Sequence, residues 1–310
     1  MSAVKLVVLV TAADLATQAL DLLKDFEVVF AGKTPDEDSL VSLCRQHQPV
    51  AIIVRYGRIP ARVMDASKAL RVISKHGSGT DTIDKEAAKA RGIAVCAAVG
   101  ANADAVAEHA WALILACAKS VVTLDARMRA GHWDKALHKS MELHGKTLGV
   151  VGLGQIGRRV ASIGVAMGMQ VVAHDPFAND PPAGVTMLPL AELLSRSNVL
   201  SLNCPLTEDN HHLVNGKTLA AMPRASILVN TGRGGLVDDD AVREALASGQ
   251  LRAAGLDAFV PEPLTGEHAW RNVPNTVLSP HIGGVSEDAY VNMGVGAARN
   301  ILAALELQRA

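Results

Sequence analysis

This chain contains few aromatic residues, no closely spaced cysteine pair and no long hydrophobic run. Only 3% of its 310 residues are Phe, Trp or Tyr, which argues against an aromatic platform for nucleic-acid bases. No apolar stretch is long enough to span a bilayer. The cysteines are scattered without a CxxC spacing, so we expect reduced thiols in a protein interior rather than a disulfide framework or a zinc site: Cys44, Cys96, Cys117 and Cys204.

The chain also lacks a surplus of charge of either sign. Lys and Arg number 30 against 31 Asp and Glu, which gives a formal net charge of −1. This balance provides no field that would attract nucleic acid or an anionic membrane, and we expect neither as a partner. The short apolar run near the start is followed at once by polar residues, which predicts a buried strand rather than a signal peptide. We therefore expect a cytoplasmic protein, and a length of 310 residues favours two domains.

Strand-like and helix-like runs alternate along the chain, which predicts an α/β fold with parallel sheets covered by helices. Residues 103–130 lack Pro and Gly and predict one long helix or two consecutive helices between two α/β regions. The expected strands are residues 5–10, 27–30, 50–54, 71–74, 93–95, 147–151, 170–173, 199–203, 226–230, 253–257 and 276–278. The expected helices include residues 14–23, 39–47, 84–90 and 286–307.

A glycine-rich turn after the strand at 147–151 is typical of a dinucleotide site. Gly152 permits the tight turn, Gly154 allows a pyrophosphate to approach the backbone, and Gly157 allows the following helix to pack on the sheet. The amino end of that helix offers unpaired N–H groups to phosphates. Asp175 follows the next strand, where a carboxylate accepts hydrogen bonds from the ribose hydroxyls. Because no Arg or Lys follows Asp175 directly, the pattern favours NAD over NADP.

Three polar residues follow later strands in loops rich in Gly or Pro: Arg233, Glu262 and His281. In an open α/β sheet such loops border the ligand crevice. Arginine clamps a carboxylate, histidine exchanges a proton near neutral pH, and a nearby carboxylate favours the imidazolium. Each residue taken singly is more often a solvated loop residue or a cap. Their joint position downstream of a nucleotide motif favours catalysis of carbonyl reduction.

Five ordered motifs carry a resemblance to a known family: GLGQIG, PLTEDNHHLVNG, NTGRGGLVDDDAV, GLDAFVPEPL and SPHIGG. Together they resemble the D-isomer-specific 2-hydroxyacid dehydrogenases, and within them the phosphoglycerate dehydrogenase and hydroxypyruvate reductase branches without a regulatory domain. The resemblance implies a nucleotide-binding domain (residues 100–284) inserted into a flavodoxin-like substrate domain (residues 1–99 plus 285–310). It also implies NAD as cofactor and a homodimer formed through the nucleotide-binding domains.

The resemblance further implies roles for individual residues. The catalytic residues would be Arg233, Glu262 and His281. The cofactor would be bound by Gly152, Gly154, Gln155, Ile156, Gly157, Asp175, Cys204, Pro205, Thr231 and Asp257. The substrate would be bound by Arg55, Lys75, Ser78 and Gly79. Two assignments have structural alternatives: Asp257 as a turn cap at a strand end, and Arg55 with Lys75 as surface charge. His76 stands where the family pattern leads us to expect a small residue, which leaves the substrate open.

The sequence thus predicts a metal-independent enzyme that interconverts a small D-2-hydroxy acid and its 2-oxo acid with NAD. One alternative keeps the chemistry but makes the substrate a phosphorylated or dianionic hydroxy acid. The other is a non-catalytic, NAD-sensing scaffold like the corepressors that resemble this family. We expect no metal at His211 and His212, which lack ligand partners at a suitable spacing, and we expect Asp238–Asp240 to open a helix. Trp111 and Trp133 are expected to be packing residues.

Overall fold

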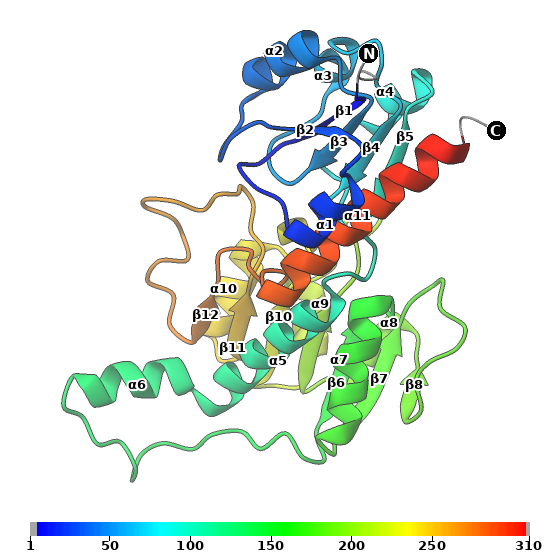
Figure 1. Ribbon diagram of the computed structural model, residues 1–310. Helices are drawn as coiled ribbons and strands as arrows, with labels where there is room; N and C mark the ends of the chain where they lie inside the picture. Colours follow the sequence, from blue (N-terminus) through cyan, green and yellow to red (C-terminus); the bar gives the residue numbers. More distant parts are fainter. Residues whose placement is uncertain (1–4, 308–310) are drawn as a thin grey trace. The chain divides into compact units, whose positions relative to one another are not determined.

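The computed structural model describes residues 5–307, which separate into two compact units (Figure 1). The first unit comprises the residues up to Asn102 together with those from Val285 onward. The second runs from Ala103 to Gly284. Each unit is built on one sheet in which every strand pair is parallel, so the predicted α/β class is confirmed.

The first unit has a five-stranded sheet with the order β2-β1-β3-β4-β5. Its strands are β1 (Val7–Val10), β2 (Glu27–Phe30), β3 (Ala51–Val54), β4 (Val72–Lys75) and β5 (Ala94–Ala97). Its helices are α1 (Thr17–Leu22), α2 (Glu37–His47), α3 (Ala61–Asp65), α4 (Lys85–Ala90) and α11 (Glu287–Leu307). The strand order reverses at β1, which is where open α/β sheets of this order bind ligands.

Alternation along the strands of the first unit explains why helices cover both faces of the sheet. In β1, Val8 and Val10 pack into a core with α1 and α11, whereas Leu9 packs into another core with α2, α3 and α4. In β3, Ile52 and Ile53 divide between these cores in the same way. Strands that are apolar on both faces require such double cover.

The second unit has a seven-stranded sheet with the order β12-β11-β10-β9-β6-β7-β8. Its strands are β6 (Thr147–Val151), β7 (Gln170–His174), β8 (Val185–Met187), β9 (Val199–Leu202), β10 (Ser226–Asn230), β11 (Leu251–Leu256) and β12 (Thr276–Leu278). Its helices are α5 (Ala103–Lys119), α6 (Val121–Arg129), α7 (Gln155–Ala166), α8 (Leu190–Arg196), α9 (Gly216–Ala221), η1 (Gly234–Leu236) and α10 (Asp239–Ala247). Residues of α5 and α7 pack into one core, and those of α8, α9 and α10 into the other.

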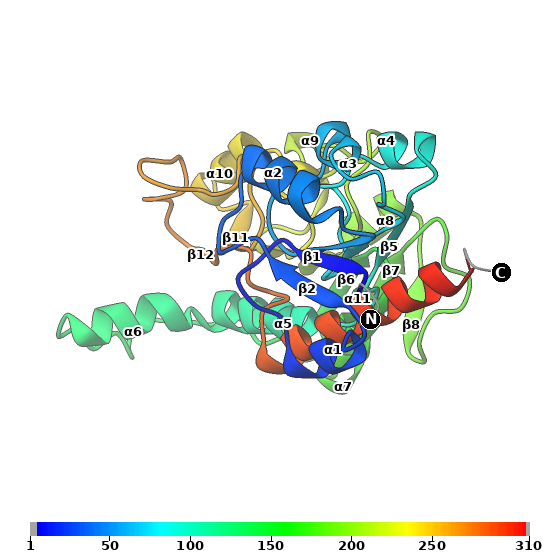
Figure 2. The same cartoon turned by 45° about the horizontal axis from the view of Figure 1, so that its top comes forward.

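The stretch predicted as one or two helices forms two. They meet at Ser120, which has a left-handed φ of 53°, and they are bent by 60°. Helix α5 is largely buried, whereas α6 extends away from the rest of its unit (Figure 2). No single helix among residues 5–307 is long and apolar enough to cross a membrane, and only the bent α5–α6 pair meets that test of length and composition.

The expectation that both tryptophans pack in a core is half wrong. Trp111 is buried in α5 and its indole N–H donates to the Val160 carbonyl oxygen at 3.0 Å. Trp133 is 76% exposed, because it follows α6 in a segment outside the core. Its neighbour Leu137 is 87% exposed. These residues give the second unit an apolar surface that the sequence pattern did not indicate.

Candidate active site

The glycines after β6 form a cradle at the amino end of α7. Gly152 has a φ of +88°, and a Cβ there would lie 2.7 Å from the Cys204 backbone nitrogen. A Cβ on Gly157 would lie 1.9 Å from the Gly152 carbonyl oxygen. A Cβ on Gly154, by contrast, would have no heavy atom within 4 Å. Two glycines are thus needed for packing, and the third leaves open backbone beside a helix amino end, as a pyrophosphate requires.

Asp175 is tied to this cradle. It directly follows β7, and its Oδ2 accepts a hydrogen bond from the Leu153 N–H at 2.7 Å. Its Oδ1 accepts one from the Phe177 N–H at 2.8 Å. Gln155 and Ile156 are the first two residues of α7. The predicted cofactor residues from Gly152 to Asp175 therefore gather at the carboxyl ends of β6 and β7.

A second group of predicted cofactor residues follows β9 and β10. Burial raises the pKa of the Cys204 thiol to about 11, so it stays protonated near neutral pH. Pro205 is the next residue and is exposed. The hydroxyl oxygen of Thr231 is buried and has no hydrogen-bond partner within residues 5–307. A buried hydroxyl without a partner is costly, so a ligand group at this position would satisfy it.

Arg233 lies on a turn that Asn230 holds in place. The fully buried Asn230 accepts a hydrogen bond from the Gly232 N–H at 3.0 Å and donates one to the Arg233 carbonyl oxygen at 2.9 Å. A Cβ on Gly234 would lie 2.3 Å from the Phe259 carbonyl carbon, so the turn packs directly on the loop that carries Glu262. Asn230 was not predicted as a site residue, although an amide at the end of a strand run is a signal for such a turn.

Glu262 and His281 form a hydrogen-bonded pair. The Nδ1 atom of His281 lies 2.7 Å from Oε2 of Glu262. The other carboxylate oxygen of Glu262 accepts from the Phe259 N–H at 2.9 Å, which fixes the direction of the side chain. His281 is 44% exposed and Glu262 36% exposed, so the pair is accessible to a substrate.

Asp257 holds the turn that carries His281. His281 has a left-handed φ of 55°, which is strained for a residue with a side chain. The buried carboxylate of Asp257 accepts hydrogen bonds from the two backbone amides that follow His281, the Ile282 N–H at 2.9 Å and the Gly283 N–H at 2.8 Å. It also accepts from the Ser279 hydroxyl at 2.6 Å. Asp257 thus makes the contacts expected if it caps a turn, which was the structural alternative to its role in cofactor binding. Its contact with a cofactor stays a prediction.

His109 of α5 completes this support. Its Nε2 atom lies 2.8 Å from the Ser279 hydroxyl oxygen and 3.4 Å from Oδ1 of Asp257. Since Ser279 donates to Asp257, the hydroxyl accepts from His109 and is not activated as a nucleophile. Neither His109 nor Ser279 was predicted from the sequence. His109 lies 170 positions before Ser279, and no local motif records such a pairing.

The predicted substrate residues lie in the first unit, at the end of β4 (Lys75) and in the loops after β3 and β4. Arg55 follows β3, and its carbonyl oxygen accepts from Nζ of Lys75 at 3.2 Å. The Ser78 hydroxyl donates to the Asn102 side chain at 3.2 Å, and Gly79 is the next residue. His76 is only 8% exposed. Burial, with the charge of Arg55, lowers its pKa to about 4, so it is neutral near pH 7.

No group of three or more His, Cys, Asp or Glu within residues 5–307 is arranged to hold a metal ion. The rings of His211 and His212 stack on each other with centroids 4.0 Å apart. Asp238 caps α10 by accepting from the Asp240 and Ala241 N–H groups, so this acidic run opens a helix as predicted.

The model of the D-isomer specific 2-hydroxyacid dehydrogenase NAD-binding domain matches residues 111–283, more than half of the chain and all within the second unit. This chain belongs to that family. It is therefore an NAD-dependent oxidoreductase that interconverts D-2-hydroxy acids and 2-oxo acids, and the predicted family, activity and cofactor are confirmed.

Relatives and a solved structure agree with this. The chain is 36% identical over 288 residues to a hydroxypyruvate reductase of Thermotoga maritima, covering 92% of this chain and 93% of that one. It is 34% identical to a D-3-phosphoglycerate dehydrogenase of Synechocystis, covering 91% of this chain but only 51% of that one. The crystal structure of the TT0316 protein from Thermus thermophilus superposes with a TM-score of 0.88 at 40% identity, covering 97% of each chain.

Proposed function

We propose that His281, Glu262 and Arg233 carry out the reaction on a small 2-oxo or 2-hydroxy acid. The observation that supports this most is the hydrogen bond of 2.7 Å between His281 and Glu262 on rigidly held turns. NAD, when bound, accepts or supplies the hydride at the substrate carbon. The protein's own residues then need only to orient the acid and move one proton.

The geometry of the pair assigns an atom to the proton transfer. Because Nδ1 of His281 faces Glu262, Nε2 is the ring atom left to meet the substrate oxygen. In reduction Nε2 donates a proton to the carbonyl oxygen, and in oxidation it removes the proton from the hydroxyl. Reduction thus needs the protonated ring and oxidation the neutral ring, so the two directions respond oppositely to pH.

Arg233 is proposed to bind the substrate carboxylate through its planar guanidinium. Arg233→Lys keeps the positive charge but loses the paired donors, so kcat/KM should fall by at least about tenfold while NADH affinity stays the same. Arg224, whose guanidinium donates to the Ser248 carbonyl oxygen, provides a control as Arg224→Lys. A loss below about threefold in Arg233→Lys would remove the clamp role.

The remaining site residues are proposed to divide between the units. The second unit would bind NAD through the cradle from Gly152 to Gly157, through Asp175, and through the loops of Cys204, Pro205 and Thr231. The first unit, approximately residues 1–99 with 285–310, would bind the substrate acid through the backbone of Ser78 and Gly79, with Arg55 and Lys75 at the far end of the substrate. Support comes from the open backbone at Gly154 and the unpartnered hydroxyl of Thr231.

The experiment that tests this function is NADH oxidation against a panel of 2-oxo acids. We expect turnover with hydroxypyruvate and with related small 2-oxo acids. NADPH should be used less efficiently by about tenfold, because a 2′-phosphate would meet the Asp175 carboxylate. No turnover with any 2-oxo acid would overturn the proposal, and equal use of both cofactors would overturn the role of Asp175.

We also propose that the enzyme is a homodimer joined through the surface around α6. Val121, Val122, Met128 and Trp133 are each more than half exposed there. Apolar surface of this kind on a projecting helix indicates a protein interface. A second copy is the proposed occupant, and sedimentation should give a dimer. Leu137→Glu should yield monomers, whereas the charge control Ala136→Glu at the adjacent exposed position should weaken the dimer less. A monomeric parent would refute the proposal.

A cytoplasmic location is the remaining proposal. The four cysteines are unpaired thiols, as expected in a reducing compartment. Cell fractionation followed by detection of the native protein tests this location, and recovery from an oxidising compartment would contradict it.

A further inference from the structure

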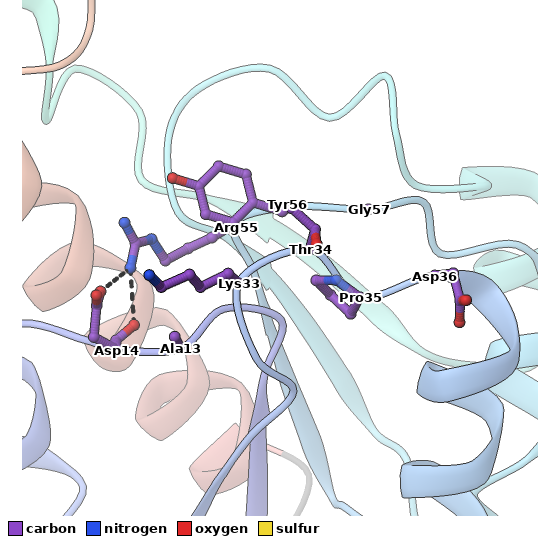
Figure 3. Close-up of a pocket in the computed structure, with 9 residues that line it drawn as sticks. All are labelled: Ala13, Asp14, Lys33, Thr34, Pro35, Asp36, Arg55, Tyr56 and Gly57. Carbon is purple, nitrogen blue, oxygen red and sulfur yellow. Dashed lines mark hydrogen bonds and ion pairs between the residues drawn. The ribbon is translucent and has the colours of Figure 1, made fainter.

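A cavity in the first unit lies among the loops that follow β1, β2 and β3 (Figure 3). Its volume is about 590 Å³. These loops meet where the strand order reverses, which is the position at which open α/β sheets bind ligands. The lining residues that carry charge are Asp14, Lys33, Asp36 and Arg55. The cavity therefore contains two cations and two anions, of which Arg55 and Asp14 form an ion pair.

Arg55 is already paired within this cavity. Its Nη1 forms an ion pair with the Asp14 carboxylate and also donates to the Asp14 carbonyl oxygen at 2.9 Å. Figure 3 shows the guanidinium directed at Asp14, with Asp36 on the opposite side of the cavity. The Arg55 side chain is 13% exposed and that of Asp14 is 69% exposed. The arginine is thus sheltered, whereas most of the Asp14 side chain faces solvent.

Two tyrosines hold the pair in this arrangement. The guanidinium carbon of Arg55 lies 5.3 Å from the ring centroid of Tyr56 and 4.8 Å from that of Tyr290. The Tyr290 hydroxyl donates to Oδ1 of Asp14 at 2.8 Å. This hydrogen bond and the one from Arg55 keep the pKa of Asp14 below its ordinary value, so Asp14 is a carboxylate near neutral pH. The negative charge beside Arg55 is therefore a fixed feature of the cavity.

A phosphate or second carboxylate on a substrate would meet this arrangement unfavourably. A free guanidinium binds such groups through paired N–H donors. Here Asp14 occupies Nη1, and its charge repels a further anion at short range. An uncharged substrate tail carries no such penalty.

We infer that Asp14 is a specificity residue that favours 2-oxo acids with an uncharged tail over those with a second anionic group. The inference rests on the proposed function, because the far end of the substrate must reach Arg55. The relatives represent two substrate classes, a 2-oxo acid with a hydroxyl tail and its phosphorylated counterpart. The charge of Asp14 would determine which of these two classes the enzyme prefers.

The test compares hydroxypyruvate, whose tail is an uncharged hydroxyl, with its phosphate ester, whose tail is anionic and larger; the comparison between variants of equal size isolates the effect of charge. The parent should prefer hydroxypyruvate in kcat/KM. Asp14→Asn keeps an acceptor for Tyr290 and Arg55 but removes the charge, so the ratio of kcat/KM for the ester to that for hydroxypyruvate should rise by about tenfold. Added salt should shrink this gain, since the interaction is between charges.

Two further variants separate specificity from structure. Asp65→Asn removes the same charge from another Asp–Arg pair of the first unit, the bidentate contact with Arg91, and should leave the ratio unchanged. Asp14→Asn combined with Arg55→Gln should lose the gain, because the freed guanidinium is then absent. Melting temperatures measured alongside show whether each variant is folded.

Failure of the specificity role of Asp14 and failure of the proposed function give different results. A parent that turns over neither compound overturns the proposed function and the inference with it. A parent that turns over hydroxypyruvate, with an unchanged ratio in folded Asp14→Asn, overturns the inference alone. A gain that survives loss of Arg55 also overturns it, because the anion would then be recognised elsewhere.

Discussion

The two units use the carboxyl ends of their parallel strands differently. In the second unit, the turns after the strands are fixed by glycines and by buried side chains such as Asn230 and Asp257. In the first unit, the corresponding loops carry a partly exposed ion pair, Asp14 with Arg55. Rigid turns suit residues that must meet a reacting atom precisely. We propose that the pair of opposite charges in the first unit recognises the substrate tail, because removal of one charge leaves the other uncompensated.

The largest effect should follow from filling the glycine cradle. Gly157→Ala forces a Cβ to within 1.9 Å of the Gly152 carbonyl oxygen, a backbone atom that cannot move aside cheaply. We expect a loss of about 1–3 kcal/mol in the free energy of unfolding and loss of NADH binding.

Gly154→Ala is the matched control, because a Cβ there has no heavy atom within 4 Å. It should weaken NADH binding with little change in melting temperature. Thermal melts and NADH fluorescence measure the two effects. Equal destabilisation by both substitutions would break the distinction between packing glycines and the open one.

A smaller effect should follow from weakening the support of the His281 turn. Ser279→Ala and His109→Phe each remove contacts from the network around Asp257. We expect kcat to fall by about tenfold, or about 1.4 kcal/mol, which is comparable to one hydrogen bond to a charged group.

A positioning role predicts a split between the kinetic parameters. NADH affinity and melting temperature should stay near the parent values while kcat falls. Ser248→Ala serves as the control, because it removes a serine contact within a helix end, the bond to the Ala245 carbonyl oxygen. If kcat is unchanged in both network variants, these residues do not position His281.

The smallest effect on turnover is expected for His76 of the first unit, whose burial should affect the stability of the protein instead. Its pKa in the folded protein is about 4, lowered chiefly by burial and secondly by Arg55, against about 6.5 in an unfolded chain. As pH falls from about 6.5 towards 4, the unfolded chain takes up a proton that the folded protein does not, so stability is lost over that range. The loss should reach up to about 3 kcal/mol at the lower end.

His76→Leu should remove this part of the acid sensitivity and leave kcat at neutral pH nearly unchanged. The exposed His132→Leu is the control and should keep the parent's pH dependence. Denaturant unfolding between about pH 4.5 and 7 provides the measurement. If the free energies of unfolding of the parent and of His76→Leu change with pH in parallel, His76 is not the cause of the loss of stability in acid.

Local pattern predicted most of the fold. Strands β6, β10 and β12 match their predicted ranges, because each is an apolar run between turn residues. Strand β8 was missed, since three residues are too few to establish a period. Helix α1 begins at Thr17 rather than at the expected Asp14. The reason is tertiary, because Asp14 lies in the extended entry to the helix and pairs with Arg55.

The candidate site was predictable only in its motif-bearing part. The glycines and Asn230 stand next to the residues they position, so their types mark the turns, whereas Asp257 holds the His281 turn from 25 and 26 positions away. The Asp14–Arg55 pair spans 41 positions and the His109–Ser279 contact spans 170, and neither leaves a local pattern. Trp133 was wrongly assigned to a core because residue type alone does not tell whether a chain segment leaves its unit.

The central claim is that the His281–Glu262 pair moves the proton while the glycine cradle binds NAD independently. Single-turnover NADH oxidation with hydroxypyruvate, measured beside NADH fluorescence titration, tests it directly for the parent, Glu262→Gln and His281→Asn. We predict NADH affinities within about twofold of the parent, hydride transfer at least about 100-fold slower in His281→Asn, and an intermediate rate in Glu262→Gln. Transfer in His281→Asn at a rate near that of the parent would contradict the claim.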